Sequence, residues 1–432
     1  MLEQSLSDSG ELHQCYLECE QYILAIPRFS KDKHSLDDLR RFLARLDNPH
    51  QGKKIIHVAG TNGKGSVCAY LQAIFAASEI TTGLFTSPHL ETMRERIKVN
   101  GRISTEAEFV SAFAVVKEKI ADFHPTFFEF LFLMAMVIFK TAAIECLILE
   151  TGLGGRLDAT NVITEKNLTI ITPIGYDHME YLGTTLAEIA SEKAGIMRPG
   201  VPLITAFQHP EVTCLLQEKA AEYDAPLVVI DNRAIKINEI TLKTIDFSYQ
   251  YRYDIIVRTI LPAKALYQIE NASLAIHAAF HFGDQRISAK SITRGLADTV
   301  WPGRMEELKP GIIFDGAHNV DGILAFIRGA EAIPCRGKKW LLFAGVREKE
   351  SRRIMDILTK SKIFAEIIAC PLPNPRSLSP ADLLTFEPSL VFADVGGGLT
   401  YLIKKKQADD LLFITGSLYL YSEVKLLGVT DD

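Results

Sequence analysis

Residues 54–66 read KIIHVAGTNGKGS and predict, in direct succession, a strand, a glycine loop and the start of a helix. The apolar, β-branched run at 54–58 is typical of a buried strand, and a helical pattern extends from Ser66 to about residue 78. In such a loop, backbone N–H groups and the positive end of the helix can surround phosphate oxygens. Lys64 would neutralise phosphate charge, and the Ser66 hydroxyl can bind magnesium. The stretch therefore indicates a nucleotide phosphate loop.

The spacing inside this loop differs from the usual GxxxxGK[ST] pattern. Val58 occupies the position of the first glycine, and Gly65 separates Lys64 from Ser66. An ordinary glycine turn between a strand and a helix can give similar letters. On this pattern alone, both interpretations stay open.

Alternating strands and helices extend on both sides of the loop. Ser35 as an N-cap, Asp38 three residues on and leucines at helical spacing predict a helix over about 36–46. Expected strands at 82–85, 146–150, 168–171 and 202–205 alternate with expected helices at 106–122, 126–141 and 185–194. This order predicts an α/β fold with a P-loop-type, doubly wound, mainly parallel sheet.

The second half of the chain changes pattern twice. Residues 235–260 alternate polar and apolar side chains, which predicts a small antiparallel insertion at the sheet edge. Helices are expected at 268–282 and 288–297, and new strands at 312–315, 340–343, 363–369, 391–393 and 411–414. We therefore expect a nucleotide-binding domain over 1–297 and a smaller, Rossmann-like α/β domain over 298–432.

Composition restricts the classes of partner. The 432 residues carry a net charge of -6, so no overall positive field attracts nucleic acid or anionic lipid. The apolar stretch 127–139 contains Glu129 and is too short to span a membrane, which favours a buried helix. The polar, acidic start does not resemble a signal peptide. We expect a cytoplasmic protein, a monomer, with small-molecule partners.

Cysteine usage points to a reducing compartment. The seven cysteines are odd in number and form no CxxC pair. Cys15 and Cys19 share a helical face near His13, but two thiols do not complete a four-ligand zinc site. We expect buried or idle thiols.

Three further polar clusters follow predicted strands. Glu150 opens the glycine-rich run ETGLGGRLDATN, Asp177 and His178 follow the next strand, and Lys193 lies on the helix after that. Carboxyl ends of parallel strands share one edge of a sheet, so we expect Glu150, Asp177 and His178 to face the phosphate loop. Glu150 as a capping carboxylate and His178 as an ordinary hydrogen-bonded residue remain alternatives.

Seven ordered stretches carry a resemblance to a known family. They are HVAGTNGKGS (57–66), GLFTSPHL (83–90), ERIKVNG (95–101), TGLGGRLDATN (151–161), DHMEYLGTTLAEIASEKAGI (177–196), WPGRMEE (301–307) and DGAHNVDG (315–322). From about residue 26 to 421, the chain resembles the folylpolyglutamate synthase and dihydrofolate synthase family of the Mur ligase superfamily. The shifted phosphate-loop spacing is also the form that this family uses.

The resemblance implies a fold and an activity. Residues 1–297 would be the Mur-ligase-like ATP-binding central domain with the folate site, and 298–432 the Mur-ligase-like C-terminal domain. The activity would be ATP-dependent ligation of L-glutamate to a folate-type carboxylate of dihydropteroate, of tetrahydrofolate polyglutamate or of both, in folate biosynthesis and one-carbon metabolism. Phosphorylation of the carboxylate gives an acyl phosphate, which the glutamate amine attacks. A free carboxylate would not react, because its charge repels nucleophiles and its hydroxide-like oxygen is a poor leaving group.

The resemblance also implies metal ligands and a modified lysine. Ser87, Glu150 and His178 would bind magnesium at two sites, with His178 at the more exchangeable one. Lys193 lies where the family carries a carbamylated lysine; burial favours the neutral amine, which can take up carbon dioxide. An unmodified lysine or a solvated charge on the helix is the alternative.

The remaining contacts are implied in the same way. The contacts to ATP would come from Gly60, Thr61, Asn62, Gly63, Lys64, Gly65, Ser66, Asn271, Arg304, Asp315 and His318. The contacts to the folate would come from Arg28, Phe29, Ser30, Thr126, Phe127, Phe128, Glu129, Leu157, Asp158 and Ala159. The residues with catalytic roles would be Lys64, Lys193, His178 and Arg304. The phenylalanines would serve equally well as core, and Asp315 as a cap.

Two rival functions fit less well. A nucleotide-dependent switch protein would carry an NKxD guanine-reading sequence, and the chain has none. A cell-wall peptide ligase of the Mur type would carry a further domain before the phosphate loop, but only about 53 residues precede the first strand, below ordinary domain size.

Overall fold

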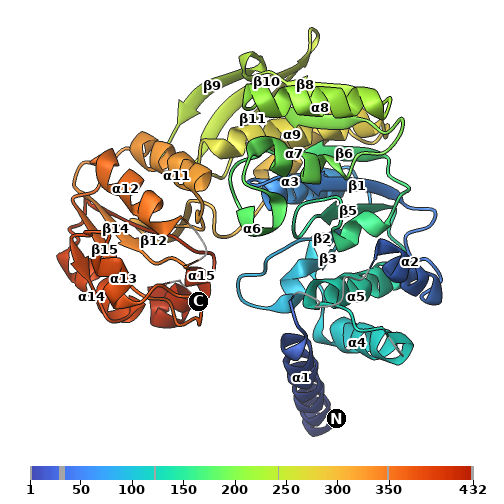
Figure 1. Ribbon diagram of the computed structural model, residues 1–432, viewed down its shortest axis with the longest axis horizontal. Helices are drawn as coiled ribbons and strands as arrows, with labels where there is room; N and C mark the ends of the chain where they lie inside the picture. The colour runs from blue at the N-terminus through green and yellow to red at the C-terminus, as the bar shows by residue number, and fades with distance from the viewer. Residues whose placement is uncertain (1, 29–34, 121–122, 242, 348–349, 430–432) are drawn as a thin grey trace. The chain divides into compact units, whose positions relative to one another are not determined.

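Strand β1 (Lys54–Ala59), which leads into the glycine loop, lies inside an eight-stranded sheet (Figure 1). The structure is a computed structural model that describes residues 2–28, 35–120, 123–241, 243–347 and 350–429. The strand order is β4-β3-β2-β5-β1-β6-β7-β8. The other strands are β2 (Thr82–Phe85), β3 (Ile97–Val99), β4 (Arg102–Ile103), β5 (Cys146–Glu150), β6 (Leu168–Ile171), β7 (Leu203–Ala206) and β8 (Leu227–Ile230). All pair in parallel except β3 and β4, so the predicted mainly parallel sheet is confirmed.

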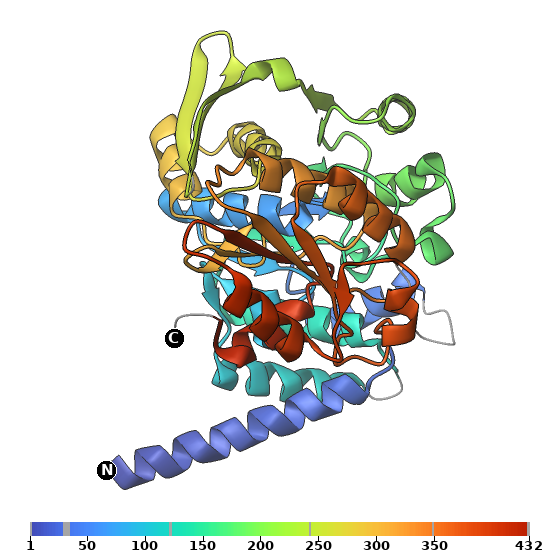
Figure 2. The same ribbon diagram turned by 90° about the vertical axis from the view of Figure 1, so that its left-hand side faces the viewer.

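Helices precede, connect and follow these strands along the chain. They are α1 (Leu2–Ala25), α2 (Leu36–Arg45), α3 (Lys64–Ala77), α4 (Glu106–Ile120), α5 (Phe127–Thr141), α7 (Leu186–Ala194), α8 (Pro210–Glu222), α9 (Tyr267–Phe282) and α10 (Ala289–Ala297), with the short helices α6 (Met179–Leu182), η1 (Met93–Arg96) and η2 (Ala159–Val162). Ser35 and Asp38 form the expected capping box of α2. Figure 2 shows α1 at the margin, with its N-terminal end pointing away from the sheet.

The apolar helix α5 is part of the main core, as predicted. Its residues from Phe130 to Met136 are fully buried, and they belong to one cluster with residues of α1, α2, α4 and β5. Among the described helices, none combines the length and the hydropathy that a membrane span requires. All seven cysteines are free thiols; Cys19 is buried and Cys15 exposed.

The segment 235–261 forms a sheet of its own, which corrects the expected insertion at the edge of the main sheet. Strands β9 (Ile235–Ile240), β10 (Ile245–Arg252) and β11 (Ile255–Leu261) pair antiparallel in the order β11-β10-β9, after the short helix η3 (Asn232–Ala234). A period of two identifies a strand but not its neighbours, which explains the error.

A third, six-stranded sheet follows in the order β12-β13-β17-β14-β15-β16. Its strands are β12 (Glu306–Lys309), β13 (Ile312–Asp315), β14 (Lys339–Phe343), β15 (Glu366–Ala369), β16 (Leu390–Val391) and β17 (Leu411–Thr415). Its helices are α11 (Val320–Ala332), α12 (Ser351–Ser361), α13 (Pro380–Leu384), α14 (Val395–Lys405), α15 (Leu420–Val424) and the π-helical turn η4 (Lys425–Val429). The sheet is parallel apart from the edge strand β12.

The chain divides into two compact units. The first comprises Met1–Ile174, Leu182–Asp231 and Ala272–Gly295, and the second comprises Gly175–Tyr181, Asn232–Asn271 and Leu296–Asp432. The second unit therefore includes two segments from before residue 298 besides the predicted C-terminal domain. The domain boundary expected at 298 stays a prediction.

Candidate functional site

The glycine loop after β1 is closely packed against the end of β6. Gly60 has φ +148, and a Cβ there would lie 1.8 Å from Oγ1 of Thr172, so the position admits no side chain. Gly63, with φ +92, precedes α3 and gives it no side-chain cap. The Lys64 amine donates to the carbonyls of Gly60 and Thr61 at 3.2 and 3.3 Å. A cation thus lies inside the loop next to an N-terminus without a side-chain cap, an arrangement suited to phosphate.

Ser87 and Glu150 meet at the carboxyl edge of the same sheet. Glu150 ends β5 opposite Val58 of β1 and is 3% exposed. The backbone N–H of Ser87, just beyond β2, donates to Oε2 of Glu150 at 3.0 Å. A hydroxyl and a carboxylate are hard oxygen donors of the kind that magnesium prefers. This pair therefore fits part of a magnesium site.

Lys193 reaches the phosphate loop from α7. Its side chain is 4% exposed, and its amine donates to the Gly60 carbonyl at 2.7 Å. Helix α7 is fixed at its start by a capping box of Thr185 and Glu188. The first unit thus brings together the phosphate loop, Ser87, Glu150 and Lys193.

The second unit holds His178 in a different network. Oδ1 of Asp177 accepts the backbone N–H of His178, whose φ is +51. Oδ2 of Asp177 accepts from Asn319 at 3.0 Å and lies 3.7 Å from Nε2 of His318. Asp177 therefore joins the His178 turn to the loop that carries His318. The shared magnesium role of His178 with Ser87 and Glu150 stays a prediction.

Asp315 is buried at the end of β13 and accepts three hydrogen bonds. They come from the Tyr267 hydroxyl at 2.6 Å and from the backbone N–H groups of Met305 and Ala317 at 2.9 and 2.8 Å. Burial raises the pKa of Asp315, although the Arg304 charge acts in the opposite direction. Asn271 is 3% exposed and donates to Gln268 at 3.0 Å. Their roles toward ATP stay predictions.

Comparison with known proteins identifies the family. Residues 58–279 match the Mur ligase middle domain. The dihydrofolate synthase/folylpolyglutamate synthase of Bacillus subtilis is 32% identical over 413 residues, which cover 91% of this chain and 94% of the relative. The folylpolyglutamate synthase of Lacticaseibacillus casei is 32% identical over 434 residues, which cover 96% and 99%. A solved structure of Escherichia coli FolC in complex with DHPP and ADP matches with a TM-score of 0.84 at 27% identity, covering 95% of this chain and 97% of that one.

The chain belongs to the folylpolyglutamate synthase and dihydrofolate synthase family. The predicted resemblance, the α/β fold and the class of ATP-dependent ligases are thereby confirmed.

In this folylpolyglutamate synthase family member, some expected folate residues have local structural roles. Thr126 and Glu129 form the capping box of α5. The Asp158 carboxylate, 5% exposed, accepts four hydrogen bonds from its own loop. Leu157 is 66% exposed. Phe29 and Ser30 lie outside the described residues, and the substrate contacts of the whole set stay predictions.

The two expected phenylalanines lie against motif residues. Arg96 stacks 5.3 Å over the Phe127 ring, and a Cβ at Gly152 would lie 2.7 Å from Cε2 of Phe128. The backbone N–H of Phe127 also donates to the Pro27 carbonyl at 3.0 Å. The start of α5 is thus adjacent to the chain before Arg28.

Sequence reasoning did not single out His89 and Arg96 as site candidates, although both lie in quoted motifs. Arg96 donates to Nδ1 of His89 at 2.8 Å. Burial, with the charges of Arg96 and Arg28, lowers the pKa of His89 to about 3, so the ring is a neutral acceptor. Tyr267 was missed as well, because no motif marks the tyrosine that binds Asp315.

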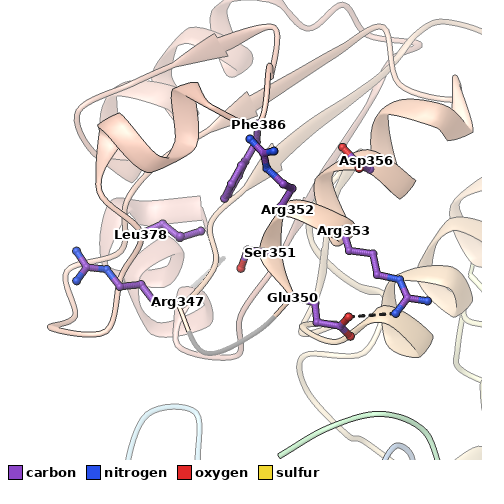
Figure 3. Close-up of a pocket in the computed structure, with 8 residues that line it drawn as sticks. All are labelled: Arg347, Glu350, Ser351, Arg352, Arg353, Asp356, Leu378 and Phe386. Atoms are coloured by element: carbon purple, nitrogen blue, oxygen red, sulfur yellow. Dashed lines mark hydrogen bonds and ion pairs between the residues drawn. The ribbon is translucent and has the colours of Figure 1, made fainter. Parts of the chain in front are cut away.

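A pocket of about 540 Å³ in the second unit has its lining residues outside these motifs (Figure 3). It is lined by Arg347, Glu350, Ser351, Arg352, Arg353, Asp356, Leu378 and Phe386. Glu350 and Arg353 pair at 3.0 Å, and Arg352 donates to the Thr385 carbonyl. Among its described lining residues none was predicted for the site, so the candidate site rests on the motif geometry. No three His, Cys, Asp or Glu side chains in the described part of the chain are arranged to hold a metal ion.

Proposed function

We propose that this chain joins L-glutamate to a folate-type carboxylate and splits ATP to ADP and phosphate. The observation that carries the proposal is the hydrogen bond between Ser87 and Glu150 beside the phosphate loop. It holds the Glu150 carboxylate, a hard oxygen donor, at the end of β5 opposite Val58 of β1, the strand that leads into the phosphate loop, as suits an ATP-dependent ligase.

The proposed chemistry begins with transfer of the γ-phosphoryl group to the folate carboxylate. Lys64 stabilises the charge of the phosphate oxygens, and Arg304 is the proposed second cation. The acyl phosphate then loses phosphate when the glutamate amine attacks its carbonyl carbon. Asn271, Asp315 and His318 are the proposed further contacts to ATP.

Ser87 and Glu150 would hold magnesium, and His178 would hold a second magnesium ion. The metal would screen the phosphate charges while the residues around it orient the two substrates. Lys193 is proposed to be carbamylated, because its buried tip at Gly60 would otherwise place an ammonium group beside a metal site. The carbamate would provide an anion there instead.

The proposed acceptors are dihydropteroate and reduced folates, so we propose a bifunctional enzyme. The Bacillus subtilis relative is named for both activities and the Lacticaseibacillus casei relative for one. Arg28, Thr126, Phe127, Phe128, Glu129, Leu157, Asp158 and Ala159 are the proposed folate contacts within the described residues. We also propose a monomer in the cytoplasm.

The test is release of ADP with dihydropteroate and tetrahydrofolate offered separately, each with and without glutamate. We expect ADP release only when an acceptor and glutamate are both present. ADP release that is independent of both would contradict a ligase. Activity with one acceptor alone would contradict bifunctionality and leave the ligase assignment in place. Light scattering of the purified chain checks the monomer.

A further inference from the structure

His57 is a fully buried histidine in the middle of β1. It is 0% exposed, and both of its neighbours along the strand, Ile56 and Val58, are fully buried apolar residues. Its Nε2 lies 2.7 Å from Oγ1 of Thr160, which lies near the end of the glycine-rich run 150–161. A buried polar group in an apolar strand destabilises the fold unless it makes hydrogen bonds. Core packing alone would favour an apolar side chain at this position, so the presence of a histidine bonded to Thr160 needs another explanation.

The protons of this contact can be assigned from the donor inventory. The Thr160 hydroxyl lies 2.5 Å from Oδ1 of Asp158 and donates to it. A hydroxyl has one proton, so Nε2 of His57 must donate to Thr160. His57 is then neutral, with Nδ1 as a bare acceptor, and Nδ1 is indeed buried without a partner among the described residues. The reversed chain would leave a buried N–H without an acceptor, a rarer arrangement in proteins.

The charges around His57 favour the neutral ring. Burial, reinforced by Lys166 and Arg198, holds the pKa of His57 well below its usual value. Both cations donate to Oδ1 of Asn161, at 2.6 and 2.8 Å. At the other end of the chain of hydrogen bonds, burial raises the pKa of Asp158, whereas its hydrogen bonds from Thr160, Leu153 and Gly152 favour the carboxylate.

The chain of hydrogen bonds ends on the glycine-rich loop. Oδ2 of Asp158 accepts the backbone N–H groups of Gly152 and Leu153, at 2.8 and 2.9 Å. Gly152 in turn packs on the ring of Phe128. Thus β1, which leads into the phosphate loop, is connected through side chains to the loop 152–158.

We infer that His57 is a positioning residue for the folate-type substrate, acting through Thr160 and Asp158 to hold the loop 152–158 in its binding conformation. The inference rests on the proposed function for the identity of the substrate. The hydrogen-bond chain itself is observed in the structure and does not depend on the proposed function. The His57 side chain is fully buried, so it is inferred to affect binding of the folate rather than the chemical step.

The experiment compares steady-state kinetics of Thr160→Val and His57→Asn with two conservative variants. Thr160→Ser keeps the hydroxyl, and the side-chain amide of His57→Gln places a donor near the position of Nε2. We expect the KM for the folate acceptor to rise about tenfold in Thr160→Val and His57→Asn. A tenfold change corresponds to ~1.4 kcal/mol, which is near the net contribution of one hydrogen bond. The KM for ATP and kcat should stay within about twofold, and the conservative pair should resemble wild type.

A matched control separates this effect from general loss of a buried hydroxyl. Thr205 in β7 is 1% exposed and donates to the Ile171 carbonyl, outside the proposed chain. Thr205→Val should lower the thermal midpoint without changing the KM for the folate. If Thr160→Val and Thr205→Val change the kinetics equally, or if Thr160→Val lowers kcat alone, the inference is wrong.

A measurement on the wild-type chain does not depend on any variant folding. In a chain labelled with 15N-histidine, His57 should give a protonated Nε2 and an unprotonated Nδ1 between pH 6 and 8; the signal is assigned by its loss in His57→Gln. The opposite tautomer, or a charged ring, would overturn the inference. If wild type shows this tautomer but no folate-dependent ADP release, the proposed function fails and the positioning role toward folate fails with it. The opposite tautomer in an active enzyme rejects the inference alone.

Discussion

The backbone N–H of Ser87 donates a hydrogen bond to Oε2 of Glu150 over 3.0 Å. The two residues are far apart in sequence, but their strands, β2 and β5, are neighbours in the sheet. The bond holds the buried carboxylate at the edge where the phosphate loop also begins. Substitutions at this edge of the sheet should therefore change activity.

Lys64→Ala should abolish ligation while the fold stays intact. The lysine amine donates to two carbonyls of its own loop, so its loss mainly removes phosphate charge neutralisation. We expect turnover to fall roughly 10²-fold or more, the scale for loss of one transition-state donor. ADP release and the thermal midpoint are the measurements. Lys360→Ala, at the exposed end of α12, is the control, and a Lys64 variant with normal turnover would refute the phosphate-loop assignment.

Glu150→Gln should make the enzyme need more magnesium. The amide oxygen can still accept the Ser87 N–H, so the loop keeps its shape while the negative charge is lost. Loss of even an indirect metal partner costs about 10–100-fold, and the half-saturating magnesium concentration should rise by at least the lower figure. A magnesium titration of ADP release checks this, with the exposed Glu239→Gln as control. An unchanged titration would show that Glu150 is a capping residue.

Lys193→Ala should be inactive and partly rescued by a short carboxylic acid, which would fill the space of the proposed carbamate. Lys193→Arg is the sharper variant, because arginine keeps a donor for the Gly60 carbonyl but its guanidinium stays protonated and takes up no carbon dioxide. We expect it to be inactive without rescue. Mass spectrometry under native conditions in bicarbonate should show the added mass on wild type. Normal activity of Lys193→Arg would disprove a functional carbamate.

The stability of the first unit should depend on acid through Arg286. Its guanidinium donates to both Glu145 and Asp284 and lowers the pKa of each to about 2. In the unfolded chain these pKa values are roughly 4.3 and 3.9, so the stabilisation is present above about pH 4 and is lost as the pH falls to about 2.

Arg286→Ala should therefore be less stable than wild type at pH 7, and the difference should shrink toward pH 2. Urea unfolding at a series of pH values measures it. The exposed Arg336→Ala should show no such pH-dependent difference. A constant gap between wild type and Arg286→Ala would contradict the ion-pair explanation.

Local patterns were enough to predict much of the first sheet. Patterns within a few residues predicted the strand at 54–58, the capping box of Ser35 and Asp38, and the apolar helix α5. The structure confirms all three. Strands β3 and β4, at one end of the sheet, were not predicted, because two or three residues carry too little periodicity.

Long-range contacts explain most of what the sequence could not reveal. His57 and Thr160 are 103 residues apart, and Tyr267 and Asp315 are 48 apart, so no spacing rule joins them. Thr126 and Glu129 illustrate the opposite difficulty. The family resemblance implies that they contact the folate, whereas the structure shows that they cap helix α5. The sequence alone does not show which of these two roles explains the residue types at these positions.

The chain passes from one unit to the other after Ile174, Tyr181, Asp231, Asn271 and Gly295. A single cut therefore cannot release either unit whole. A fragment that ends at residue 297 would retain Ala265 but lose Ile313 and Phe326, which share its hydrophobic core, and Lys264 would lose its ion-pair partner Glu307. We therefore expect insoluble pieces when the gene is split after residue 297, whether for fragment complementation or for exchange of halves between relatives. An exposed turn such as the one at Tyr253 is a better place to cut the chain.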